Sequence, residues 1–210
     1  MTTSQTRLRI SADSTASLID VEDASVLTYD ELVGWAGAEN VGRADPGALA
    51  HWLIPDDQKA ILVDVGVPVA HQLIEYPALQ PEAAPQLATN DGRRLYQLTA
   101  NHHRNLVPGL LWAFGVEPRT GTVYYVLPGG EPWFANSSVE LWLKCLHHYG
   151  LNLTQSNILD KGDELEEQEE GAALAYFHRL AAEVKEIDPA AFDGPSSHLI
   201  WPEILELWYW

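Results

Sequence analysis

The fold is decided by residues 110–149, which read LLWAFGVEPRTGTVYYVLPGGEPWFANSSVELWLKCLHHY. This stretch opens with two apolar, aromatic-rich runs, Leu110 to Val116 and Thr122 to Leu127, separated by a short turn. In that turn Pro118 fixes one backbone angle and Gly121 tolerates a positive φ, as a tight connection requires. The two runs are therefore predicted to pair as antiparallel strands.

A third strand and a helix are predicted directly after this hairpin. The apolar run Pro132 to Ala135 is short and follows a Pro-Gly-Gly turn. Ser137 then lies three residues before Glu140, the spacing of a capping box, so a helix is predicted to begin here. Its apolar residues recur three or four positions apart and would pack on the sheet. They are Val139, Trp142, Leu143 and Leu146.

Elsewhere in the chain, local signals predict two more helices. Thr28 and Glu31 have the capping-box spacing and open a helix that Gly37 can end. Pro55 suits the first turn of another helix, which Gly66 can end. Both helices are predicted to lie before the hairpin in the chain.

The remaining segments are assigned from their residue types. Arg94 to Ala100 alternates as a strand does, and the proline-rich segment Gln80 to Asp91 before it is predicted to be a loop. Gly150 to Gly162 is predicted to be a polar loop, Asp163 to Ile187 a long helix, and a last helix is expected to start at Pro202. The side of the long helix predicted to be buried carries Leu174, Phe177, His178, Ala181 and Val184.

The order of these elements resembles the fourth family of the SUKH superfamily of bacterial immunity proteins. The resemblance spans roughly Tyr29 to Leu207, and the sequence departs from the family in its aromatic tail and in the segment Gln80 to Asn90. The segments that carry it are Ile61 to Pro68, Gly121 to Tyr124, Phe134 to Ser138, Ile187 to Pro189 and Trp201 to Leu205.

This resemblance and the element pattern together predict an α+β fold, with an antiparallel (mixed) sheet of about five to six strands flanked by helices. With 210 residues, 46% of them hydrophobic, the chain is long enough to bury the core of a single domain. We expect residues 1–27 to form an N-terminal extension with a strand, 28–149 the core, and 150–210 a C-terminal helical part.

The charge balance limits the choice of partner. Twelve Lys and Arg residues face 30 Asp and Glu residues, for a formal charge of -18. Nucleic acids and anionic membrane surfaces are polyanions and are therefore disfavoured as partners, whereas a basic protein would be attracted. The alternative interpretation is that the charge only keeps the protein soluble.

The cysteine count and hydropathy point to the cytoplasm. Cys145 is the only cysteine, which excludes an internal disulfide, and its place among helix residues is typical of a small core residue rather than a nucleophile. Residues 1–9 lack the apolar run of a signal peptide, and no stretch approaches the length of a membrane span, about 18 apolar residues. We therefore expect a cytoplasmic protein without a membrane partner.

The acidic run near residue 165 has two interpretations. Its carboxylates could simply favour the positive end of the helix that follows. They could also dock a toxin with a basic cleft, imitating the phosphates of its substrate and speeding encounter. The residues concerned are Asp163, Glu164, Glu166, Glu167, Glu169 and Glu170.

Tryptophan is unusually frequent, with eight in the chain. Trp35, Trp52, Trp112 and Trp142 fall in apolar patterns and are predicted to be core residues. Trp133, beside a glycine-rich turn, and two tryptophans of the tail are candidate contact residues, because exposed aromatic residues often anchor interfaces. The two in the tail are Trp208 and Trp210, and the tail could instead fold back and seal a hydrophobic edge.

Catalytic and metal sites are not predicted. The adjacent pairs His102-His103 and His147-His148 would point their side chains in different directions, and no His-Glu-x-x-His string occurs. Ser137 and Ser138 lack the flanking glycines of a nucleophile elbow. We therefore expect no catalytic residue, no cofactor and no metal.

The resemblance implies an immunity protein that binds a cognate polymorphic toxin and covers its active or substrate-binding surface. It leaves the toxin type open among nuclease, deaminase and other activities. Two alternatives remain at this point: a scaffold or regulatory interaction domain, and a small metal-dependent hydrolase that uses His102, His103 and Asp91.

Overall fold

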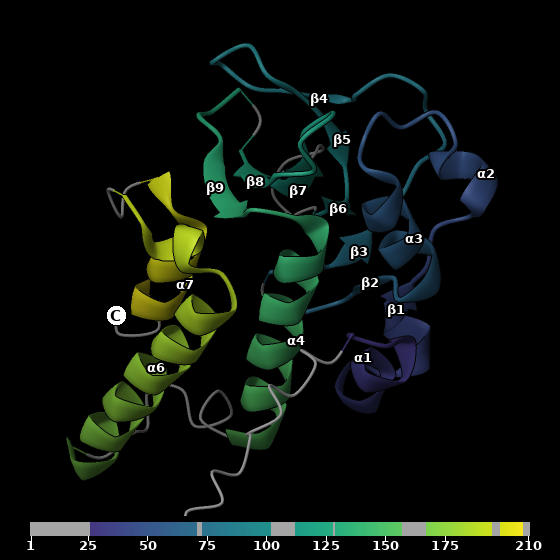
Figure 1. Ribbon diagram of the computed structural model, residues 1–210. Coiled ribbons are helices and arrows are strands. Elements are labelled where there is room, and N and C mark those ends of the chain that lie inside the picture. The colour runs from purple at the N-terminus through teal and green to yellow at the C-terminus, as the bar shows by residue number, and fades with distance from the viewer. Residues whose placement is uncertain are drawn as a thin grey trace, which may run out of the picture.

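The computed structural model has an α+β architecture, with helices beside an antiparallel sheet of five strands (Figure 1), which confirms the predicted fold class. The structure describes residues 26–70, 73–101, 112–127, 129–156, 167–194 and 198–207. The predicted N-terminal strand lies outside these residues.

The five strands are hydrogen-bonded in the order β4-β5-β7-β8-β9. Their bounds are β4 Leu87–Ala88, β5 Arg94–Gln97, β7 Ala113–Val116, β8 Val123–Val126 and β9 Trp133–Asn136. The predicted hairpin is confirmed: β7 and β8 pair from Ala113↔Val126 to Val116↔Val123, and Gly121 in their turn has φ +75°. The predicted third strand is β9, which pairs with β8.

Two short antiparallel pairs accompany the main sheet. β1 (Val41–Gly42) pairs with β2 (Val67–Pro68), and β3 (Tyr76–Pro77) pairs with β6 (Thr99–Ala100). These two pairs connect chain segments that lie between the early helices and the main sheet.

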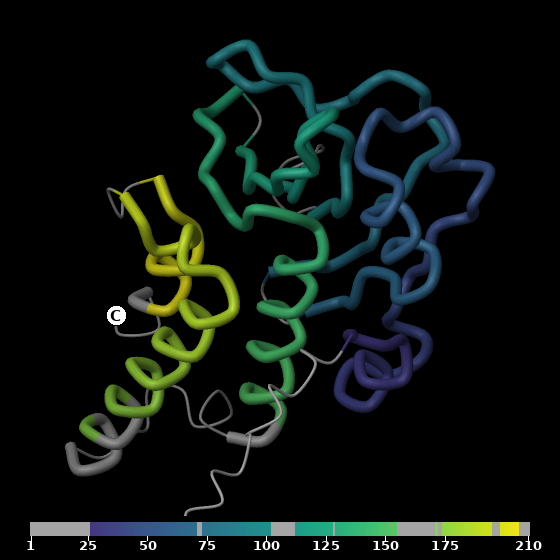
Figure 2. The backbone as a smooth tube through the Cα atoms, viewed as in Figure 1, coloured from purple at the N-terminus to yellow at the C-terminus, as the bar shows by residue number. Residues whose placement is uncertain are grey.

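The helices lie on either side of one central helix (Figure 1). Their bounds are α1 Tyr29–Ala36, α2 Pro46–Leu49, α3 Asp56–Asp64, α4 Val139–Ser156, α6 Glu167–Ile187 and α7 Ile200–Leu207, with 3-10 turns η1 Ala38–Asn40 and η3 Pro189–Phe192. Figure 2 shows α4 between the N-terminal part of the described chain, in purple and blue, and the C-terminal part, in yellow.

The start signals of α1 and α3 are confirmed. The Thr28 hydroxyl accepts a hydrogen bond from the Glu31 amide at 3.3 Å, and the Glu31 carboxylate accepts one from the Thr28 amide at 2.7 Å. α3 begins immediately after Pro55, and Gly66 follows its end with φ +88°. Local sequence therefore sets the ends of these helices.

The predicted capping box at the start of α4 is wrong by one residue. The cap is Ser138, whose hydroxyl accepts a hydrogen bond from the Leu141 amide at 3.2 Å. Ser137 instead donates its hydroxyl hydrogen bond to Asp188 at 3.0 Å, and Glu140 pairs with Lys144. The reason is a tertiary contact, because the buried carboxylate of Asp188, 51 residues later in the chain, binds Ser137.

α4 also continues where a loop was predicted from Gly150, since the helix runs to Ser156. Gly150 is buried, and a Cβ atom there would lie 2.3 Å from the ring of Trp35. The glycine therefore lets α1 approach α4 closely. It is a packing residue inside the helix and not its end.

Residues 80–100 differ from the prediction in two ways. The predicted loop contains β4, because the turn at Gly92, with φ +86°, returns the chain along β5. The single strand expected over 94–100 is divided: β5 pairs with β4 and β7, whereas β6 pairs with β3. Leu95 and Tyr96 point to opposite faces of the sheet, and both side chains are buried. The expected alternation of buried and exposed residues is therefore absent.

The main hydrophobic core lies between the sheet, α4 and the flanking helices. The predicted α4 stripe of Val139, Trp142, Leu143 and Leu146 is fully buried. Trp52 is also buried, whereas Trp35 and Trp112 are only partly so. On α6, Phe177 and Val184 are buried as predicted but His178 is exposed, and the last helix starts at Ile200, ahead of Pro202.

Candidate partner-binding surface

Most of the predicted contact residues fall outside what the structure describes. These are Asp163, Glu164, Glu166, Trp208 and Trp210. Three members of the acidic run, Glu167, Glu169 and Glu170, belong to the first turn of α6. Trp133 is the first residue of β9.

Trp133 and the acidic start of α6 lie apart. The C-terminal end of α6 meets the end of β9, where Ser137 binds Asp188. Because α6 has 21 residues, its first turn lies about 30 Å from that junction, and Figure 1 shows it pointing away from the sheet. Trp133 itself is partly buried, with its ring centroid 6.1 Å from that of Tyr125. The two groups do not form one compact patch.

A buried polar cluster joins the end of β9 to the C-terminal part of the chain. The Asp188 carboxylate, 2% exposed, accepts hydrogen bonds from the Asn136 side chain at 3.0 Å and from the Ser137 amide at 2.8 Å, in addition to the Ser137 hydroxyl. The Trp201 indole donates to the Asn136 oxygen at 2.9 Å. These residues belong to the segments that carry the family resemblance, and their contacts hold the fold together.

Cys145 lies next to this cluster. Its sulfur is 3.3 Å from the Asn136 side-chain nitrogen and is completely buried. Burial raises the pKa of the Cys145 thiol to about 12, so the thiolate is scarcely populated at neutral pH. The residue behaves as a core residue, in agreement with the sequence.

The His147 and His148 side chains have different partners. His147 accepts a hydrogen bond from the Trp35 indole at 3.1 Å, and burial lowers its pKa, whereas His148 contacts Glu183 at 2.8 Å. His102 and His103, on which the hydrolase alternative rests, lie outside the described residues. Among the residues that are described, no group of three His, Cys, Asp or Glu side chains could hold a metal ion.

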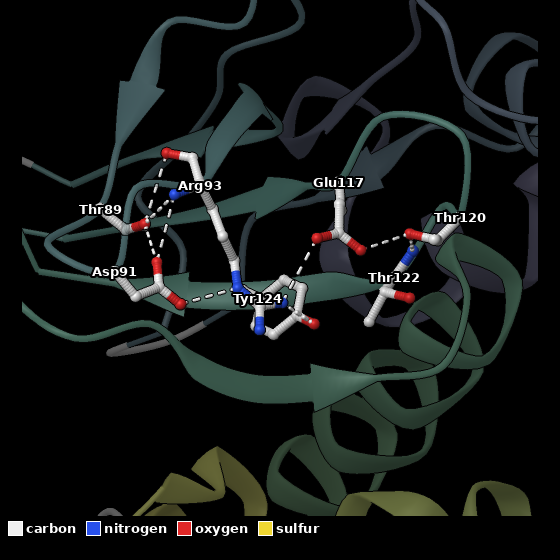
Figure 3. A network of polar contacts seen from close by, with 7 residues as sticks. All are labelled: Thr89, Asp91, Arg93, Glu117, Thr120, Thr122 and Tyr124. Atoms are coloured by element: carbon white, nitrogen blue, oxygen red, sulfur yellow. Dashed lines mark hydrogen bonds and ion pairs between the residues drawn. The ribbon is translucent and has the colours of Figure 1, made fainter.

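Arg93 is the centre of an accessible polar network at one end of the sheet (Figure 3). Its guanidinium donates to Asp91 at 2.8 Å and to Glu117 at 3.3 Å, and also to the Tyr124 hydroxyl. The same guanidinium lies over the Tyr124 ring, 4.5 Å from its centroid. The network joins the β4–β5 turn to the β7–β8 hairpin, and 38% of the Arg93 side chain is exposed.

The environment of the network fixes its charge state. The hydrogen bond from Thr89 lowers the pKa of the Asp91 carboxyl, and Arg93 adds to this effect. Partial burial raises the pKa of Tyr124 and keeps its phenol neutral. Although partial burial opposes it, the pKa of Arg93 is raised by Asp91, Tyr124 and Glu117. Arg93 is therefore a fixed cation with a preset orientation.

A third segment adjoins the tip of the β7–β8 hairpin. The Arg119 amide, at the tip of the β7–β8 hairpin, donates a hydrogen bond to the Leu53 carbonyl in the loop between α2 and α3. Leu53 carries an exposed side chain, and Asp56 and Asp57 follow in the first turn of α3. The Leu53 loop and the Arg93 network thus both meet the β7–β8 hairpin, but on opposite faces of the sheet: Tyr96, whose hydroxyl accepts from the Leu53 amide, belongs to the main core, whereas Tyr124 packs against the smaller second cluster.

Sequence reasoning missed both of these features. The string Asn90-Asp91-Gly92 is a hairpin signal and could have revealed the β4–β5 turn. For Leu53 there was no signal, because it stands between Trp52 and Ile54 in a uniformly apolar run. Only the tertiary structure shows which of the three is exposed.

In the described part of the chain, no helix is long and apolar enough to cross a membrane.

The architecture is that of a SUKH-like α+β protein, in which helices flank an antiparallel sheet. The family model described as SUKH-4 immunity protein matches residues 27–207, which is most of the chain. The chain belongs to this family, and the family implies an immunity function against a toxin. Searches among curated proteins and among solved structures gave no match.

Proposed function

We propose that this protein binds a cognate toxin domain in the cytoplasm and neutralises it by covering its active or substrate-binding surface. The observation that carries the proposal is the match to an immunity protein family over residues 27–207. Occlusion needs affinity and shape and no catalytic group, which agrees with a buried, protonated Cys145.

The chemistry of the partner follows from charge. A protein with a formal charge of -18 attracts a basic domain and accelerates its encounter. Toxins that act on nucleic acids, such as nucleases and nucleic-acid deaminases, need a basic cleft for their polyanionic substrate. We therefore favour a toxin of this kind as the partner.

The test is co-expression of this protein with the candidate toxin domain encoded beside it, followed by purification of the pair. We expect growth to be rescued and the two proteins to elute together at a one-to-one ratio. If the toxin kills cells equally with and without this protein and no complex forms, immunity by occlusion is overturned.

The acidic run has its own test. Glu166, Glu167, Glu169 and Glu170 are replaced together by Gln, and the association rate with the toxin is measured at low and high salt. Steering by these carboxylates predicts slower association and a weaker salt dependence in the variant. An unchanged association rate at both salt concentrations would show that these carboxylates do not steer the toxin and only stabilise the start of α6.

A further inference from the structure

Trp35 fastens helix α1 to the central helix α4, beside which α1 lies in Figure 1. Its indole N–H donates a hydrogen bond to the Nδ1 atom of His147 at 3.1 Å. Its ring packs against Gly150, about one turn further along α4, where a Cβ atom would lie 2.3 Å from the ring. The Trp35 side chain therefore fits closely against α4, and its polar atom is bound to a histidine.

The hydrogen bond between Trp35 and His147 requires a neutral imidazole. The indole N–H of tryptophan can only donate, so the Nδ1 atom of His147 must carry no proton. In the imidazolium form both ring nitrogens carry protons, and two N–H donors would face each other across this contact. The contact that fastens α1 is therefore lost when His147 becomes charged.

The other contacts of α1 give it limited support. The helix has eight residues, and Leu32 is its buried side chain. A helix of this length is not stable in water without tertiary packing. At its end, the Asn40 side chain donates to the Ala36 carbonyl at 2.7 Å, and the Arg43 guanidinium lies 4.5 Å from the centroid of the Tyr29 ring. Among the residue types in all these contacts, histidine is the one whose ordinary pKa lies near neutrality.

The surroundings of His147 determine which state acid favours. Burial lowers the pKa of His147, Glu31 on α1 opposes this effect, and the adjacent His148 on α4 adds to it. Lys144, about one turn earlier on α4, is paired with Glu140 at 2.7 Å. Because the pKa is lowered while α1 is in place, a His147 side chain released into water binds a proton more tightly. By linkage, a falling pH therefore favours the state in which α1 is released.

We propose that α1 is a pH-sensitive element, held on α4 while His147 is neutral and released from it when His147 binds a proton. The rest of the fold stays in place, and release uncovers the surface of α4 around His147 and Gly150. The face of the protein near α1 then differs between neutral and mildly acid solution. This device goes beyond the proposed function, and its test needs no toxin.

The experiment is hydrogen exchange of the purified protein between pH 5 and pH 8, followed by mass spectrometry and corrected for the intrinsic pH dependence of exchange. We expect the protection of the α1 amides to fall below the ordinary histidine pKa of about 6.5, by no more than about tenfold per pH unit, the limit for one proton. The amides of α3, which also packs against α4, serve as the internal control and should keep their protection.

Two variants identify the group that titrates. His147→Gln can still accept from Trp35 but cannot bind a proton, so the pH dependence of α1 protection should disappear. His148→Gln, the matched control at the adjacent position, should keep a pH dependence. The proposal is overturned if α1 protection in the wild-type protein is the same at pH 5 and pH 8, or if His147→Gln loses protection as the wild type does. Equal loss of protection in α1 and α3 would also overturn it, because the whole fold would then be opening.

Discussion

Asp188 and Asp91 are bound by the same kinds of group, yet they serve different parts of the molecule. Each carboxylate accepts hydrogen bonds from a hydroxyl, a backbone amide and a side-chain N–H group. The donors to Asp188 come from the end of β9, far away in the chain, and the site is buried. The donors to Asp91 lie two residues away, and the site is exposed.

The difference shows that burial and chain separation, more than the number of hydrogen bonds, decide what a polar cluster does. When a buried carboxylate is removed, its hydrogen-bond donors cannot reach water. When an exposed carboxylate is removed, its donors bind water instead. The Asp188 cluster is therefore expected to hold the fold, and the Asp91 turn to keep Arg93 presented.

The largest expected effect is that of Asp188→Ala. It leaves the fully buried Asn136 side-chain amide without its carboxylate acceptor and removes both hydrogen bonds of Ser137, so we expect the free energy of unfolding to fall by about 3 kcal/mol. Urea denaturation followed by tryptophan fluorescence measures it. Asp91→Ala, the matched control, should cost less than about 1 kcal/mol. Equal losses in the two variants would refute the contrast between the clusters.

Two helical glycines, Gly150 and Gly171, differ in their packing as the two carboxylates differ in their burial. In Gly150→Ala the new Cβ atom meets the Trp35 ring, which should destabilise the protein by about 1–3 kcal/mol. In Gly171→Ala, on α6, no atom of the described residues lies within 4 Å of the new atom, so a gain of about 0.5–1 kcal/mol in helix stability is expected. Thermal unfolding of both variants checks the opposite signs.

His147 offers a smaller, pH-dependent test of burial. Because burial lowers its pKa in the folded protein, the unfolded chain binds more protons below its ordinary pKa of about 6.5. The contribution of His147 to stability should therefore be fully present above pH 7 and be lost progressively as the pH drops below that value. Glu31 opposes the shift, and the neighbouring His148 adds to it.

The control for this pH dependence is His147→Gln, which can still accept from Trp35 but cannot titrate. Unfolding by urea is measured between pH 5 and pH 8 for both proteins. A shallower slope is expected for the variant below pH 7. Parallel slopes would mean that His147 contributes nothing to the acid sensitivity.

The smallest effect on stability is expected for Arg93→Ala. Its ion pairs with Asp91 and Glu117 are partly exposed, so the free energy of unfolding should change by less than about 1 kcal/mol. Chemical denaturation of the purified variant tests this. A loss as large as that of Asp188→Ala would place Arg93 among the residues that hold the fold.

Local signals were sufficient for much of the fold. The Thr28–Glu31 capping box and the Gly121 turn were predictable because all the interacting groups lie within a few residues of one another. Ser137 was assigned wrongly because its true partner, Asp188, comes 51 residues later. Gly150 was taken for a helix end because the Trp35 ring that requires a glycine is contributed by α1.

The candidate site was less predictable than the fold. The acidic run is visible in the sequence because charge is a property of composition. The Leu53 loop and the Arg93 network are not visible, because the contacts of Leu53 with Arg119 and of Arg93 with Glu117 form only after the helices and the hairpin have packed. Exposure of an apolar residue depends on its neighbours in space and cannot be read from a uniformly apolar string.

The position of the Asp188 cluster in the chain bears on when protection can begin in a living cell. A ribosome completes β9 and α4 long before it adds Asp188 and Trp201. Until those residues emerge, Asn136 lacks both of these partners, and we expect the nascent chain to be an unfinished inhibitor. A premature stop codon between α4 and Asp188 should thus remove immunity almost as completely as an early one.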